Sequence, residues 1–167
     1  RDAARFSEIL FCTLATAGRP DLRPIVGARE LLVVDEAGQA LEPEILSAAE
    51  AAQARRCVLC GDPMQLPPIS ITNDQEARIF LEQDIFSFVS GADSTDALFK
   101  WHDDNPEFTS FFDTQYRLRS DLAEVISSVF YDGRLKSGAE QKKKRKKLPH
   151  KEAAVIIVSE WNDIVTV

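Results

Sequence analysis

The chain has 167 residues, of which 44% are hydrophobic and 28% charged, and its formal net charge is −7. These values fit one globular domain or parts of two, and no apolar stretch is long enough to span a membrane. A free-standing nucleic-acid-binding module is usually basic, so the acidic balance argues against that class. The acidic net charge still allows an enzyme that binds nucleic acid in one local groove. The sequence opens without Met and shows no signal peptide, so we expect it to begin inside a larger polypeptide.

Short apolar runs predict strands, and the segments between them have the pattern of helices. One helix has Pro43 near its start, where a helix accepts proline, and another has Ser120 as its expected N-cap. Alternating strands and helices predict an α/β fold, with a parallel sheet that carries helices on both faces. The expected strands are residues 9–12, 31–34, 57–60 and 155–158, with a weaker aromatic run at 108–112; the expected helices are residues 43–54, 76–89 and 121–130.

The composition changes at "SGADSTDALFKWHDDNPE", which is rich in Asp, Ser, Gly and Asn. Such a composition is typical of a loop, so we expect a linker over residues 91–107. It would divide the chain into domains at residues 1–90 and 108–167. The basic run "QKKKRKK", residues 141–147, is interpreted as a solvated loop, with phosphate contact and a nuclear-import signal as alternatives.

The three cysteines do not form a regular pattern that would predict a disulfide framework. Cys57 and Cys60 form a CxxC, but a zinc site would need a second pair of ligands. A redox CxxC usually lies at the start of a helix, whereas Val58 lies in an expected strand. We therefore expect these cysteines, and Cys12, to pack in the core.

The apolar run of residues 31–34 ends directly on two acids, Asp35 and Glu36. An unpaired carboxylate is costly to bury, so both side chains should lie where the strand emerges, at its carboxyl edge. In open α/β sheets this edge is where ligands bind. The alternative is that the two acids only mark the end of the strand and cap the helix that begins near Pro43.

Two further segments have residue types suited to phosphate and base recognition. "GDPMQLPP" follows the expected strand 57–60, and its glycine and prolines predict a rigid turn that would hold Gln65 against a phosphate or water. "QYRLRSDL" precedes the helix at 121–130. Arg117 offers a planar fork of donors suited to phosphate, and Tyr116 offers a flat face for a base.

Taken in order, DEAGQ, GDPMQLPP, QYRLRSDL and FYDGRL resemble the motifs of superfamily 1 helicases. More closely, they look like the branch that contains the nonsense-mediated-decay helicase, senataxin and the immunoglobulin-mu-binding helicase. It covers residues 9–135, and "ILFCTLATAG" is similar to the nucleic-acid-contacting segment that precedes the DEAD-like motif. The resemblance implies part of a RecA-like, P-loop NTPase core that uses ATP and Mg²⁺.

The resemblance also implies roles for the residues that face the nucleotide. "VVDEAGQ" is similar to a Walker B motif, in which Asp35, with Glu36 beside it, would bind Mg²⁺. Glu36 would also orient and deprotonate the attacking water. Gln39 would lie near the γ-phosphate and the coupling path to nucleic acid, and Gln65 would sense the γ-phosphate.

The resemblance also implies roles in contacts with the transferred phosphoryl group, the adenine base and the nucleic-acid strand. Arg117 matches the arginine that stabilises charge on the transferred phosphoryl group, as an arginine finger does. Tyr116 matches a position that packs against adenine. Thr13 and Gly18 would contact the nucleic-acid backbone.

One part of the family pattern is missing: the phosphate-binding string GxxxxGK[ST] occurs nowhere in the 167 residues. The late motifs of the second domain are also absent. We therefore expect a piece of a longer helicase, inactive by itself, whose half sheet exposes a strand edge and apolar faces.

The leading hypothesis is an ATP-dependent helicase or translocase on single-stranded RNA or DNA, moving 5′ to 3′ by resemblance, in the nucleus or cytoplasm. It would work with the remainder of the helicase core or a larger assembly. The alternative is a non-catalytic structural remnant or subunit of a nucleoprotein assembly. A P-loop ATPase unrelated to nucleic acid is a third, weaker hypothesis.

Overall fold

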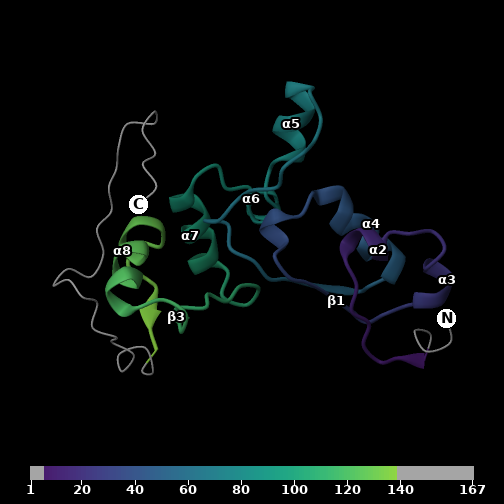
Figure 1. Ribbon diagram of the computed structural model, residues 1–167, viewed down its shortest axis with the longest axis horizontal. Helices are drawn as coiled ribbons and strands as arrows, with labels where there is room; N and C mark the ends of the chain where they lie inside the picture. The colour runs from purple at the N-terminus through teal and green to yellow at the C-terminus, as the bar shows by residue number, and fades with distance from the viewer. Residues whose placement is uncertain (1–5, 139–167) are drawn as a thin grey trace, which may run out of the picture. The chain divides into compact units, whose positions relative to one another are not determined.

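The computed structural model describes residues 6–138. The chain divides into two compact units, Arg1–Phe108 and Thr109–Val167, and each is described by itself (Figure 1). The predicted strand at residues 155–158 and the basic run at 141–147 lie outside the described residues.

Both units combine helices with a small parallel sheet, which confirms the predicted α/β class. Strand β1 pairs with β2, and β3 pairs with β4, in both cases parallel. The first unit contains α2 (Leu14–Ala17), α3 (Arg23–Val26), β1 (Leu31–Val34), the 3-10 helix η1 (Ala37–Gln39), α4 (Glu42–Ala52), β2 (Arg56–Leu59), α5 (Gln75–Leu81), α6 (Ile85–Ser90) and α7 (Thr95–Asp104). The second unit contains β3 (Thr114–Gln115), α8 (Ser120–Phe130) and β4 (Lys136–Ser137).

The core of the first unit lies on one face of its sheet. Val34 at the end of β1 is buried with Ala37, Ile45 of α4 and Ile85 of α6. The alternate positions of the strand point the other way, and Val33 is 57% exposed. Strand β1 therefore exposes one apolar face, as expected.

Helix α4, which connects the two paired strands, follows the prediction closely. Pro43 lies in the first turn, and the Glu44 carboxylate accepts a hydrogen bond from the Leu41 N–H at 3.3 Å. Both features stabilise a helix start, because proline lacks the N–H that would be unpaired there and an acid complements the helix dipole. Helix α2 packs against α4 (Figure 1).

The segment predicted as one helix over residues 76–89 forms two, α5 and α6. Asp84 lies between them in an extended conformation, and its carboxylate accepts hydrogen bonds from the N–H groups of Phe86 and Ser87. Aspartate in this role starts a new helix, so the hydrophobic periodicity alone could not show the break.

The segment at residues 91–107, predicted as a loop or linker, contains the ten-residue helix α7. Ser94 caps it by accepting a hydrogen bond from the Ala97 N–H at 3.3 Å, and Asp96 lies in the first turn. Ser and Asp occur in loops but also favour helix starts, so composition alone gave the wrong prediction.

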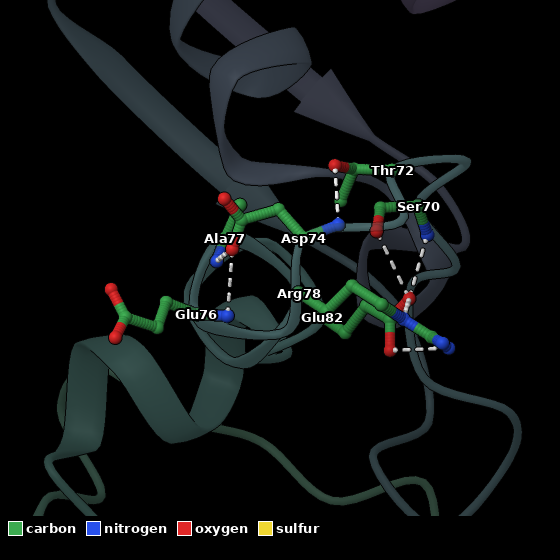
Figure 2. A network of polar contacts seen from close by, with 7 residues as sticks. All are labelled: Ser70, Thr72, Asp74, Glu76, Ala77, Arg78 and Glu82. Atoms are coloured by element: carbon green, nitrogen blue, oxygen red, sulfur yellow. Dashed lines mark hydrogen bonds and ion pairs between the residues drawn. The ribbon is translucent and has the colours of Figure 1, made fainter.

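Helix α5 is anchored by polar contacts at both ends (Figure 2). At its start, Asp74 Oδ1 accepts hydrogen bonds from the N–H groups of Glu76 and Ala77. At its end, Glu82 pairs with Arg78 and accepts hydrogen bonds from the N–H and hydroxyl of Ser70, each at 3.0 Å. The Arg78 guanidinium, followed by the Ser70 N–H, lowers the pKa of Glu82.

The strands predicted at residues 9–12 and 108–112 do not form in the described part of the chain. Phe11 is 94% exposed and Phe112 is 83% exposed. A strand exists only when its backbone groups pair with a neighbouring strand, and an apolar run does not specify that neighbour.

The second unit is built around α8. Its Ser127 is buried, and the hydroxyl accepts from the Leu135 N–H at 3.0 Å while donating to the Leu135 carbonyl at 2.9 Å. The expected cap at Ser120 is wrong: the N-cap is Arg119, whose side chain makes no capping hydrogen bond, and Ser120 is the first helical residue. Lys136 of β4 pairs with Asp113 at 2.8 Å, and this hydrogen bond lowers the pKa of Asp113.

The cysteines do not pack as predicted. Cys12 and Cys57 are exposed, Cys60 is only partly buried, and all three are free thiols. Partial desolvation raises the pKa of Cys57, which disfavours the reactive thiolate. The described helices are too short or too polar to cross a bilayer.

Candidate nucleotide-binding site

Asp35 and Glu36 follow β1 directly, at its carboxyl end, and both side chains are exposed. Asp35 Oδ1 accepts a hydrogen bond from the Glu36 N–H at 3.1 Å, and Glu36 Oε2 accepts one from Gln39 Nε2 at 3.3 Å. Three of the predicted site residues therefore lie together. Neither acid caps α4, whose N-cap is Leu41, so the capping alternative is wrong.

Glu36 has a strained backbone. Its φ of 54° and ψ of 38° lie in the left-handed region, where its side-chain carbon crowds the following carbonyl. For a residue other than glycine this conformation costs roughly 1–2 kcal/mol. Such strain is found where the surrounding fold imposes a geometry, often at functional sites.

Two backbone hydrogen bonds join the end of β1 and its following loop to the loop that follows β2. The Cys60 N–H donates to the Val34 carbonyl, and the Ala37 N–H donates to the Cys60 carbonyl, both at 2.8 Å. Gly61 allows this close approach, because a Cβ there would lie 3.0 Å from the backbone nitrogens of Ala37 and Gly38. The predicted DEAGQ and GDPMQ segments therefore meet at one edge of the sheet.

Gln65 is exposed and is held by a residue that the sequence analysis did not assign. Its Nε2 donates to Asp62 Oδ2 at 2.9 Å, and its N–H donates to the Asp62 carbonyl at 3.1 Å. Asp62 Oδ1 also accepts from the Met64 N–H at 3.0 Å. Aspartate commonly closes a turn in this way, and the Asp-Pro pair was the available signal.

The two exposed acids fit one part of an Mg-ATP site. Among residues 6–138, no three His, Cys, Asp or Glu side chains gather closely enough to hold a metal by themselves. Mg²⁺ usually binds one or two carboxylates and completes its shell with water and substrate phosphates, which Asp35 and Glu36 suit. The backbone cradle for those phosphates has no counterpart string in this sequence.

Thr13 and Gly18, predicted to contact nucleic acid, lie at the two ends of α2. Thr13 is exposed, and its Oγ1 accepts from the Thr16 N–H at 3.2 Å as the N-cap. Gly18 ends the helix close to Ser47, and an added Cβ would lie 2.5 Å from the Ser47 Oγ. Both residues therefore have a local structural role, which leaves the Thr13 hydroxyl at the surface.

Tyr116 and Arg117 belong to the second unit, in the turn between β3 and α8. Tyr116 is 60% exposed, and Arg117 is also exposed. In the described part of the chain Arg117 forms no ion pair, whereas Arg119 pairs with Asp121 at 2.6 Å. The Arg117 guanidinium is thus available to a ligand.

Two neighbours of this turn were not predicted. A side chain at the buried Gly138 would overlap the Tyr116 ring, so this glycine allows the ring to lie against the backbone. Gln115 holds the turn through its side chain. Gln115 is next to Tyr116 in the sequence, but only the fold brings Gly138 to this turn.

Comparison with known proteins supports the motif assignment. The family model of an AAA domain matches residues 1–73. The human 3'-5' exoribonuclease HELZ2 is 31% identical over 131 residues, which are 78% of this chain and 4% of HELZ2. The DNA polymerase alpha-associated DNA helicase A of Schizosaccharomyces pombe is 32% identical over 139 residues, 83% of this chain and 18% of that protein.

A third relative belongs to the branch that the motifs indicated. The Regulator of nonsense transcripts 1 homolog of Neurospora crassa is 29% identical over 138 residues, 83% of this chain and 11% of that protein. The chain thus spans between 4% and 18% of the lengths of these three relatives. The chain belongs to the superfamily 1 helicases, in the branch of the nonsense-transcript regulator, and forms part of their AAA helicase domain.

Proposed function

We propose that this chain is part of the core of an ATP-driven helicase or translocase that moves 5′ to 3′ on single-stranded RNA or DNA. One observation carries the proposal: the Ala37–Cys60 hydrogen bond joins the DEAGQ and GDPMQ loops at the carboxyl edge of a parallel strand pair. Ligands of open α/β sheets bind at that edge. The family membership supports the use of ATP and Mg²⁺.

In this proposal four residues of the first unit act on Mg-ATP. Asp35 and Glu36 hold Mg²⁺, and Glu36 orients the attacking water and accepts its proton. Gln39 and Gln65 donate hydrogen bonds toward the γ-phosphate region. Bound Mg-ATP supplies the phosphoryl group and the charge of the metal. The left-handed backbone of Glu36 supports this role, because strain of this kind is often found at functional sites.

The second unit contributes a cation and a flat ring. Arg117 stabilises charge on the transferred phosphoryl group; its guanidinium is exposed and forms no ion pair with another residue of the range 6–138, which supports this role. Tyr116 packs against the adenine base with its exposed ring. In the first unit, Thr13 and Gly18 at the two ends of α2 contact the backbone of the single-stranded nucleic acid. The protein would act in the nucleus or the cytoplasm.

The test is ATP hydrolysis by the native protein, with and without single-stranded RNA or DNA. Glu36→Gln should retain nucleotide binding and lose about 10²–10⁴-fold in kcat, because it removes the base. Glu44→Gln is the matched control, since it removes one nearby charge while glutamine can still accept from the Leu41 N–H. Equal rates in the two variants would remove Glu36 as the base.

Arg117 has its own comparison in the same assay. Arg117→Ala should lower kcat about 10³-fold or more while changing nucleotide affinity far less, as expected for a finger. Arg119→Ala, which removes the paired arginine two positions later, should have a small effect on kcat. If the native protein binds single-stranded RNA or DNA but hydrolyses no ATP, the alternative of a non-catalytic structural subunit is favoured instead.

A further inference from the structure

The side chain of Gln115 uses its whole hydrogen-bonding capacity within the second unit. Its Oε1 accepts from the N–H groups of Arg117 at 2.9 Å and Leu118 at 2.7 Å. Its Nε2 donates to the Leu118 carbonyl at 3.0 Å and to the Ser137 hydroxyl at 2.8 Å. A glutamine amide has two donor hydrogens and two acceptor lone pairs, so all four are satisfied.

These four contacts hold the turn between β3 and α8, beside a very short sheet. Strands β3 and β4 pair over only two residues each, and two further backbone bonds flank this pairing: the Lys136 N–H donates to the Asp113 carbonyl at 2.6 Å, and the Gly138 N–H donates to the Gln115 carbonyl at 2.9 Å. The Gln115 side chain wraps the following turn around itself and ties it to Ser137 of β4. Gln115 is half-buried, while Tyr116 and Arg117, which follow it, face solvent.

We infer that Gln115 is a positioning residue, which fixes the backbone from which Arg117 projects. This inference rests on the proposed function of Arg117 as the group that stabilises phosphoryl charge. A long side chain reaches a defined point only if its backbone is fixed, and a misplacement of about 1 Å can cost about 10²-fold in rate. The hydrogen bond to the Arg117 N–H acts at that backbone directly.

The test variant is Gln115→Met, which keeps the length of the side chain and removes all four hydrogen bonds. Its kcat for strand-stimulated ATP hydrolysis should fall about 10- to 100-fold in the native protein. In an Arg117→Ala background the same change should have almost no further effect, because residues that act as a unit are not additive. A merely structural role would lower kcat by the same factor in both backgrounds, and that result would overturn the inference.

A second readout does not depend on activity. Hydrogen–deuterium exchange of the Arg117 and Leu118 amides should accelerate in Gln115→Met, because both lose their acceptor. Ser128→Ala is the matched control: it removes one side-chain hydrogen bond to the Val125 carbonyl on the same unit and should leave both readouts unchanged. Unchanged exchange in Gln115→Met would overturn the inference regardless of the rates.

The two single variants, Arg117→Ala and Gln115→Met, distinguish a failure of this inference from a failure of the proposed function. Normal kcat in Arg117→Ala alone would overturn the proposed role of Arg117 and, with it, the positioning role. Low kcat in Arg117→Ala with normal kcat in Gln115→Met would overturn only the positioning role. If Gln115→Met does not fold, Gln115→Asn takes its place in both backgrounds, because its amide is one methylene group shorter and cannot keep the four contacts at once.

Discussion

Glu36 offers a direct test of whether this site stores backbone strain. Its φ of 54° should cost roughly 1–2 kcal/mol relative to glycine, which adopts this conformation freely. Glu36→Gly removes that cost but makes the unfolded chain more flexible, which offsets about 0.4–1 kcal/mol. The exposed hydrogen bond to Gln39 contributes at most a few tenths of a kcal/mol. We therefore expect Glu36→Gly to raise the free energy of unfolding by about 0.5 kcal/mol.

The same variant should lose turnover, because the carboxylate is gone. The chain offers a matched control in Gln53→Gly, since Gln53 has a φ of 47° at the end of α4. It should gain similar stability and retain normal turnover. Urea denaturation followed by circular dichroism measures the first quantity, and ATP hydrolysis by the native protein measures the second. The strain argument is refuted if Glu36→Gly is destabilised while Gln53→Gly is stabilised.

The remaining predictions concern two glycines and one carboxylate. Gly61→Ala should lower the free energy of unfolding by about 1–3 kcal/mol in urea denaturation, because the new methyl group crowds backbone atoms that cannot rotate away; wild-type stability would contradict this. Gly138→Ala should raise KM for ATP more than it lowers kcat, because it displaces the Tyr116 ring; an unchanged KM would argue against adenine contact there. The folded pKa of Glu82 is lowered, so its contribution to stability is fully present above its unfolded pKa and lost as pH falls through the folded one. The stability difference between wild type and Glu82→Gln should therefore vanish in acid, and a difference that persists there would exclude the pairing with Arg78.

Several elements could be predicted because their signals are local. The apolar run of residues 31–34, which is β-branched at its end, became β1, and the Pro- and Glu-containing start near Pro43 became α4. The strand expected at 57–60 formed one residue earlier as β2, within the usual uncertainty of element ends. A parallel pair followed from the alternation of these elements, since parallel strands need a crossover helix.

Other elements could not be predicted, because their signals are ambiguous or non-local. Asp84 and Ser94 cap helices α6 and α7, yet the same residue types are common in loops. The aromatic run at 108–112 has strand propensity but pairs with no strand in the described residues. Cys57 is apolar enough for a core, but it remains exposed in β2, and this was decided by packing.

For the candidate site, the sequence by itself predicted which side chains would carry the chemistry and determined that Asp35 and Glu36 end a strand. Spacing along the chain is enough for that, because a strand and its terminal residues are contiguous. Only the tertiary structure decided the left-handed backbone of Glu36, the support of Gln65 by Asp62 and the approach of Gly138 to Tyr116. These features depend on hydrogen bonds and close contacts set by the folded backbone, and no pattern of residue types specifies them.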